Sequence, residues 1–255
     1  MSFDNSVLTL TSSFLVICTL AVVHITIGRW HWLHRSEHSA WLSVSAGTAL
    51  AYVFVFLLPK LAATQEKLNA ILAASEWQPL LRNQVYLIAM LGLVFFFWLG
   101  WLDERVGHLG HGTARTRKSR LLLHIGGYGV YSLQLGFLVA GLPRPDHLSH
   151  MLATAVLGLH LMGVDHGIRD KAPLAYDRLL RWVFSGALFL GWGLGTITAA
   201  LNTVILLWSA FIGGGIVITA LRDELPSGRI TRFAPFLYGA VGASAAILTI
   251  QSLQN

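Results

Sequence analysis

Long runs of apolar residues recur along the whole chain, and short polar segments separate them. A helix needs about 20 mainly apolar residues to cross the hydrocarbon core of a bilayer. By this criterion the pattern predicts eight membrane-spanning helices, near 7–28, 39–59, 84–102, 120–142, 148–168, 180–201, 203–221 and 233–252. We therefore expect an all-α, polytopic integral membrane protein with a single membrane domain over residues 1–255.

Two of the polar segments are longer than the others. Residues 60–83 mix apolar and charged positions, which predicts an amphipathic helix on the outer membrane surface. Residues 103–119 are polar, basic and glycine-containing, which predicts a flexible cytoplasmic loop. That loop carries His108 and His111, whose spacing allows either loose metal binding or ordinary solvation.

The composition agrees with a membrane protein. Only 12% of the residues are charged, whereas soluble domains carry about 25%. Soluble globular, disordered, collagen-like and coiled-coil classes are therefore excluded. The single cysteine, Cys18, permits no disulfide within the chain. The sequence has none of the common hydrolase, zincin, P-loop or dinucleotide-binding motifs, so we do not expect an enzyme.

The charges between the predicted spans set the orientation. The first, third, fifth and seventh loops, with the arginines at adjoining span ends, hold 14 of the 18 Lys and Arg residues. The positive-inside rule makes these loops cytoplasmic and both termini extracytoplasmic. The same loops explain the net charge of +6, so no nucleic-acid partner is expected. The expected surroundings are the lipid bilayer of the cell's inner (plasma) membrane, and a homodimer is kept as a candidate assembly.

The second and seventh predicted spans share a pattern. Gly47 precedes Pro59 by twelve residues, and Gly214 precedes Pro226 by the same number. The two spans cross the bilayer in opposite senses, and similarity between oppositely oriented helices is typical of an inverted repeat. Because glycine and proline are frequent in membrane helices generally, chance similarity is the alternative interpretation.

Polar side chains within a bilayer are costly and mark candidate functional positions. In the fourth span, His124, Tyr128 and Tyr131 recur at helical spacing and form one polar stripe. This stripe fits either a hydrogen-bonded seam between helices or the lining of an ion path. In the fifth span, His160 and Asp165 lie about 140° apart around the helix, so they cannot easily grip one small ion.

Further ionisable residues lie towards the cytoplasmic ends of the spans. Asp165 and His166 either snorkel to that surface, pair with Arg169 or act as relay groups. Asp223 and Glu224 close the seventh span on the same side and are interpreted as solvated carboxylates. Imidazole and carboxylate together favour zinc, iron or manganese over calcium. A site with only two or three such ligands is expected to bind metal transiently.

These features resemble the ZIP (Zrt/Irt-like) family of divalent-metal transporters. The resemblance is carried by the eight predicted spans, the histidine-bearing third loop, the stretch SAGTAL…LP at 45–59 and the stretch GGG…LRDELP at 213–226. It implies a 3+2+3 inverted-repeat bundle, in which helices one to three are inverted against helices six to eight around helices four and five.

The resemblance also implies a function, namely transport of zinc, iron or manganese towards the cytoplasm without a tightly bound cofactor. His124 and His160 match family histidines in helices four and five and would be metal ligands, with Asp165 and His166 as exit-side relay groups. Where the family carries an acidic residue in helix four, this chain has Tyr128.

Two other functions stay open. One is a non-transporting membrane protein that keeps the same scaffold and has a binding or regulatory role. The other is a haem b electron carrier that uses two histidines as axial ligands, chosen from His24, His124, His160 and His166.

Overall fold

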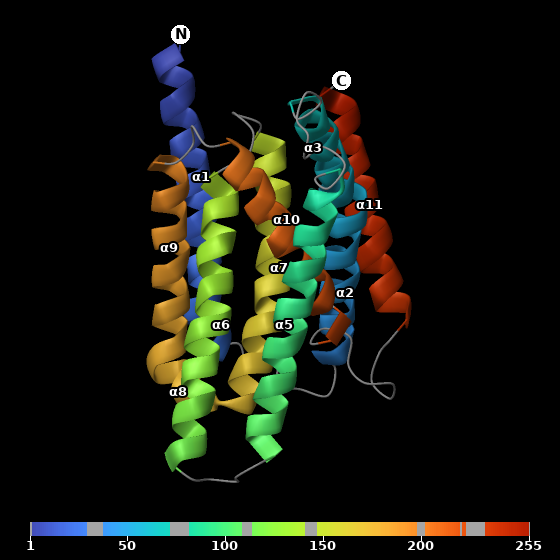
Figure 1. The fold of residues 1–255 in the computed structure, drawn as a ribbon. Coiled ribbons are helices and arrows are strands. Elements are labelled where there is room, and N and C mark those ends of the chain that lie inside the picture. Colours follow the sequence, from blue (N-terminus) through green and yellow to red (C-terminus); the bar gives the residue numbers. More distant parts are fainter. Residues whose placement is uncertain are drawn as a thin grey trace.

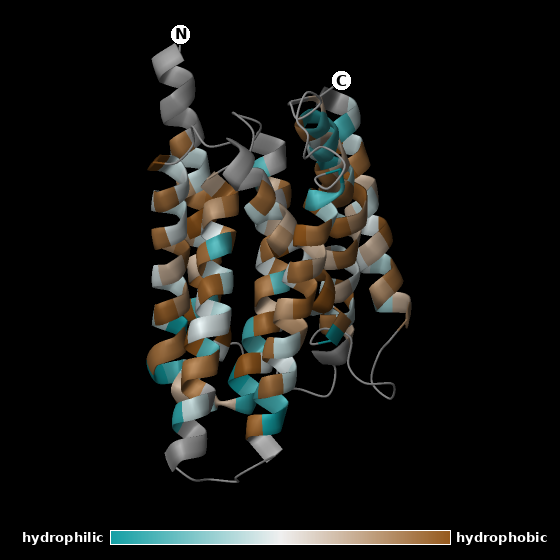
Figure 2. Ribbon diagram, viewed as in Figure 1, coloured by the Kyte–Doolittle hydropathy of each residue, from teal (hydrophilic) through white to brown (hydrophobic). Residues whose placement is uncertain are grey.

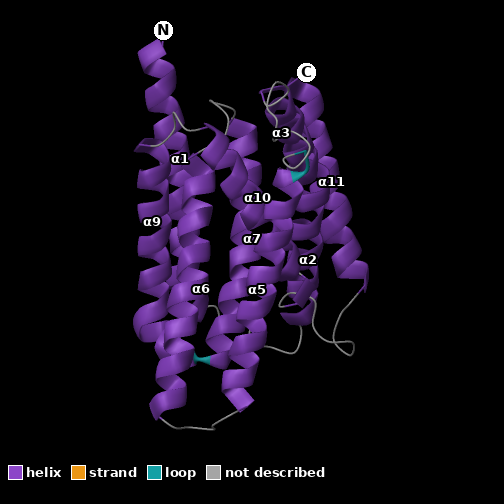
Figure 3. Ribbon diagram, in the orientation of Figure 1, coloured by secondary structure: helices purple, strands orange, loops and turns teal. Residues whose placement is uncertain are grey.

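The computed structural model describes residues 2–29, 38–71, 82–108, 114–140, 147–197, 202–219, 221–222 and 233–254. Apart from residues 82–83 and 172, every one of these residues is helical (Figure 3). The expectation of an all-α chain is therefore confirmed for the described residues.

The chain forms a bundle of long helices (Figure 1). In order, the elements are α1 (Ser2–Thr26), η1 (Ile27–Arg29), α2 (His38–Ala51), η3 (Tyr52–Leu57), α3 (Leu58–Ile71), α5 (Gln84–His108), α6 (Ala114–Ala140), α7 (His147–Lys171), α8 (Pro173–Ala175), η4 (Tyr176–Leu180), α9 (Arg181–Ile197), α10 (Asn202–Thr219) and α11 (Phe233–Gln254). Of these, η3 and η4 are π-helical turns. Pro59 follows η3 and cannot donate a backbone hydrogen bond, which favours a widened turn there.

Seven described helices are long and apolar enough to cross a membrane. They are Leu10–Arg29, Ala40–Ala70, Gln84–Val106, Leu121–Ala140, His150–Lys171, Pro173–Ile197 and Phe233–Ser252. The remaining predicted span corresponds to α10, whose described apolar part, Leu207–Thr219, is shorter. An integral membrane protein is thus supported, and the total of eight spans stays a prediction.

The surface of the bundle differs from that of a soluble domain, while its core is mainly apolar. Large apolar residues such as Trp98, Leu190 and Tyr238 are exposed, whereas polar residues such as His160 and Asp165 are buried. Apolar segments run along the length of most helices (Figure 2). Bilayer hydrocarbon accepts such a surface, while buried polar groups need partners inside the bundle.

The second span is longer than predicted. α2, η3 and α3 follow one another without a break from His38 to Ile71, so the predicted end near residue 59 is wrong. In the extension, Gln65 is buried and its side-chain oxygen accepts a hydrogen bond from the backbone N–H of Val85 at 2.9 Å. The extension therefore packs against the start of α5. The rest of the predicted surface helix, at 72–81, lies outside the described residues.

The predicted flexible loop at 103–119 is largely helical, because α5 and α6 both extend into it. Glu104, beyond the predicted span end, forms an ion pair with Arg222 at 2.7 Å. Such polar contacts extend the helix past the point where its hydrophobicity ends. Residues 109–113, including His111, lie outside the described part of the chain.

The helices pack in two groups. For description we name α1, α6, α7 and α9 the α7 group and α2, α3, α5, α10 and α11 the α10 group; the two groups also contact each other closely, α6 against α5 and α10, and α7 against α2. In Figure 1, α6 and α9 lie on the left, and α3 and α11 lie on the right. The N- and C-terminal ends are on the same side of the bundle (Figure 1), so the opposite end is the one that the loop charges predict to be cytoplasmic.

Three helix pairs are held in close contact by pairs of glycines. In each, a Cβ added to one glycine would overlap the carbonyl oxygen three residues before the glycine of the other helix, and the reverse also holds. The pairs are Gly47–Gly239 between α2 and α11, Gly92–Gly214 between α5 and α10, and Gly136–Gly191 between α6 and α9. Small residues allow membrane helices to approach until their backbones touch.

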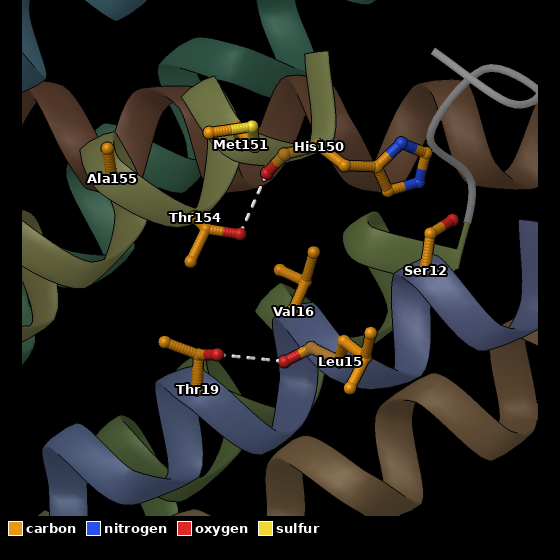
Figure 4. A pocket seen from close by; sticks show the side chains of 8 residues that line it. All are labelled: Ser12, Leu15, Val16, Thr19, His150, Met151, Thr154 and Ala155. Carbon is orange, nitrogen blue, oxygen red and sulfur yellow. Dashed lines mark hydrogen bonds between the residues drawn. The ribbon is translucent and has the colours of Figure 1, made fainter. Parts of the chain in front are cut away.

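The α1/α7 pair is packed differently. A Cβ added to Gly158 of α7 would make only an ordinary contact, 3.9 Å from Leu20 of α1. Nearer the side of the termini, a groove of about 570 Å³ separates the two helices (Figure 4). Its lining residues are Ser12, Leu15, Val16, Thr19, His150, Met151, Thr154 and Ala155. The hydroxyls of Thr19 and Thr154 donate to carbonyls of their own helices, which leaves the groove wall mainly apolar.

Candidate functional site

Buried polar side chains meet along the boundary between the α7 group and the α10 group. At its middle, the Tyr131 hydroxyl of α6 lies 2.6 Å from His160 Nε2 of α7. The Thr219 hydroxyl of α10 approaches the same nitrogen at 3.5 Å. Phe96 of α5 packs edge-on against Tyr131, with 5.2 Å between ring centroids. Four helices from both groups therefore converge on this pair.

Nearer the predicted cytoplasmic end, the boundary carries charge. Asp103 of α5 is buried, and its Oδ1 lies 3.2 Å from His124 Nε2 of α6. Its Oδ2 lies 3.8 Å from Lys171 Nζ of α7. One carboxylate of the α10 group thus contacts two helices of the α7 group.

α2 contacts α7 on another side. The Ser45 hydroxyl donates to the backbone carbonyl of Leu159 at 2.8 Å. The ring of His166 packs edge-on against Trp41, with centroids 5.9 Å apart. The boundary between the two groups therefore includes both His160 and His166, at separate places.

A second polar cluster lies inside the α7 group. His24 Nδ1 of α1 and Asp165 Oδ2 of α7 lie 2.6 Å apart, with side chains 1% and 0% exposed. The Tyr176 hydroxyl donates to the backbone carbonyl of His24 at 3.0 Å. His24 Nε2 and Asp165 Oδ1 have no hydrogen-bond partner among the described residues. Because separating a buried pair would leave an uncompensated polar group, this contact ties α1 to α7.

The periodicity of α7 keeps the two clusters apart. At about 100° per residue, His160 and Lys171 lie about 20° apart on one face, and Asp165 and Arg169 lie about 40° apart on another. The first face contacts α5 and α6. On the second face, Asp165 contacts α1, and Arg169 Nε donates to Asp177 Oδ1 at 2.9 Å. This agrees with the expectation that His160 and Asp165 do not grip one ion.

The four predicted metal-site residues have different surroundings. His124, His160 and His166 lie on the group boundary, while Asp165 contacts α1. His124 and the Tyr131–His160 contact are separated by about 10 Å along α6. No three His, Cys, Asp or Glu residues come together as a metal-binding group in the described ranges. The ligand set is therefore not preassembled there, and its metal-binding role stays a prediction.

Other sequence expectations have clear outcomes. The alternative in which Asp165 snorkels or pairs with Arg169 is wrong, because Asp165 is fully buried against His24. On α6, His124 and Tyr131 both bond to side chains of neighbouring helices, which agrees with the predicted seam and leaves the lining of an ion path a prediction. Asp223 and Glu224 lie outside the described residues.

Asp103 is the boundary residue that sequence reasoning missed. It directly follows the predicted end of the third span, where an acidic residue is ordinarily interpreted as solvated. The signal that could have found it is the good helix-forming pair Glu104-Arg105, which favours continuation of the helix beyond Asp103.

No protein-family model, curated protein sequence or solved structure matches this chain.

Proposed function

We propose that the protein is a membrane transporter that carries a divalent cation towards the cytoplasm, along the boundary between the α7 group and the α10 group. The observation that carries the proposal is the equivalence of two glycine pairs within the α10 group. Secondary transporters are commonly built from inverted repeats, with binding residues at the repeat interface. Rocking of the two groups would give alternating access to that boundary.

The two glycine pairs correspond residue by residue. Gly47 of α2 and Gly214 of α10 each stand twelve residues before a proline. A Cβ added to Gly47 would overlap the carbonyl oxygen three residues before Gly239. A Cβ added to Gly214 would overlap the carbonyl oxygen three residues before Gly92. α2 and α11 run in one direction along the bundle, and α5 and α10 run in the opposite direction (Figure 1). Equal contacts in opposite directions are what the 3+2+3 inverted repeat would give, with spans two and three corresponding to spans seven and eight; the Gly136–Gly191 contact of α6 and α9 has the same form, without an equivalent between α1 and α7.

The side chains along the boundary suit a divalent transition metal. His124 and His160 supply imidazole nitrogens, which favour zinc, iron or manganese. Both nitrogens are engaged by protein groups in this structure, so cation binding requires those partners to give way. His166 lies further along α7 towards the predicted exit, as a relay group would, whereas Asp165 faces α1 and lies off this boundary.

A non-transporting protein with the same scaffold is the second candidate. It is favoured by the lack of a three-ligand group among the described residues. It is also favoured by the hydrogen bonds that already engage His124 and His160. Such a protein would use the scaffold for binding or regulation. An absorption spectrum of protein from haem-supplied cells separates the haem b carrier from both, because bound haem gives a Soret band.

Uptake by proteoliposomes tests the proposal. The purified full chain is expected to give saturable uptake of Zn²⁺, Mn²⁺ or Fe²⁺, and His160→Ala is expected to abolish it. His150→Ala is the matched control, because His150 lies on the same helix beside the α1/α7 groove. Absence of saturable uptake, together with no binding tighter than about 100 μM by calorimetry, would favour the non-transporting protein.

A further inference from the structure

Two consecutive carboxylates on α5 hold different parts of the bundle. Asp103 is buried and contacts His124 of α6 and Lys171 of α7, which both belong to the α7 group. Glu104 is 58% exposed at its side chain and contacts Arg222, which follows α10 in the α10 group. Asp103 therefore joins the two groups, whereas Glu104 acts within one.

Asp103 carries the ionic contacts between the groups. Among ion pairs of described residues, the two that cross the boundary both end on this carboxylate. Elsewhere the described part of the boundary is held by contacts that involve no carboxylate, such as the Tyr131–His160 and Ser45–Leu159 hydrogen bonds.

Separating the groups at this end would break both of these contacts at once. The Asp103 carboxylate is 3% exposed, and Lys171 is 33% exposed. Parting a buried carboxylate from its partners is unfavourable until water reaches it. Opening of the boundary would admit that water, so these contacts favour the closed arrangement that the structure shows.

We infer that Asp103 is the positioning residue that latches the predicted cytoplasmic end of the boundary, closing it when bound to His124 and Lys171. Release of those two partners lets α6 and α7 move away from α5. The identity of the ion that passes through the opening rests on the proposed function, whereas the latch itself does not.

A distance measurement tests the latch without any transported ion. Spin labels are placed on α5 and α7 at the exposed positions Arg105 and Asp170, with Cys18→Ser as background. Double electron–electron resonance then gives the distance distribution in reconstituted full-length protein. Asp103→Asn is expected to raise the ratio of long to short distances about tenfold or more, since it weakens both contacts.

Two further variants make the test specific. Lys171→Gln removes one partner at a part-exposed position, so it should shift the distribution in the same direction without a buried substitution. Glu104→Gln is the matched control, and it should leave the distribution unchanged. The latch is overturned if Asp103→Asn and Lys171→Gln both behave like wild type, or if Glu104→Gln shifts the distribution equally.

The latch and the transport proposal fail in different ways. A shift in distances without uptake of any cation would reject the transport proposal and keep the latch. Saturable cation uptake by the wild type, with unchanged distances in Asp103→Asn and Lys171→Gln, would keep the transport proposal and reject the latch.

Discussion

The α6/α9 and α1/α7 pairs belong to the same helix group but are held together by different means. Between α6 and α9, Gly136 and Gly191 bring the two backbones into contact. Between α1 and α7, the buried His24–Asp165 pair makes one strong point of contact, and a groove lies nearer the side of the termini.

The difference shows two solutions to the same problem. In a bilayer, apolar side chains gain little by leaving lipid for another helix, so helix pairs depend on close packing or on polar contacts. The glycine pair gives close packing over several residues. The His24–Asp165 contact joins α1 and α7 at one depth, and the groove separates them nearer the side of the termini.

The largest loss of stability is expected when the His24–Asp165 contact is removed. Asp165→Ala leaves His24 buried without its partner and should destabilise the protein by about 3–5 kcal/mol. Thermal unfolding in detergent measures this. The double variant His24→Leu/Asp165→Leu should recover much of the loss, because both polar groups are removed together. A wild-type melting temperature for Asp165→Ala would contradict the role given to this pair.

The second largest loss of stability is expected from a bulky residue at the Gly136–Gly191 contact between α6 and α9. Gly136→Val would force α6 away from the carbonyl of Leu188 on α9, at a cost of about 1–3 kcal/mol. Gly193→Ala on α9 is the control, because a Cβ added there meets no atom within 4 Å. The control should be neutral or more stable by up to about 1 kcal/mol through helix propensity. Equal shifts in melting temperature for Gly136→Val and Gly193→Ala would refute the role given to the Gly136–Gly191 contact.

The repeat is tested by the smaller alanine substitutions. Gly47→Ala and Gly214→Ala occupy equivalent places in the two glycine pairs of the α10 group, so each should cost about 1–2 kcal/mol. Chemical or thermal unfolding should give values that agree within about 0.5 kcal/mol. A large loss in one variant and none in the other would count against the inverted repeat.

The smallest expected effect is at the middle of the group boundary. Tyr131→Phe removes one hydroxyl from His160, and interhelical hydrogen bonds in membranes average about 0.6 kcal/mol. The melting temperature should therefore change little, while cation uptake changes because His160 loses its partner. A melting shift as large as that of Asp165→Ala would show that this contact is structural.

Much of the architecture followed from local sequence patterns. Apolar runs placed the helices because a bilayer demands internally hydrogen-bonded backbone over a fixed thickness. The equal spacing of Gly47 and Gly214 from their prolines marked two glycines that both pack against a backbone carbonyl of another helix, but it did not indicate their partners, Gly239 and Gly92. The periodicity of α7 indicated that His160 and Asp165 face different neighbours.

Only the tertiary structure decided which polar residues meet. His24 and Asp165 are 141 positions apart, and His124 and Asp103 belong to different helices. Such pairings depend on how helices rotate and pack, which residue types alone do not determine. The sequence by itself determined that buried polar groups must find partners. The packing of α1, α5, α6 and α7 decided that Asp165 binds within one helix group and that Asp103 joins two.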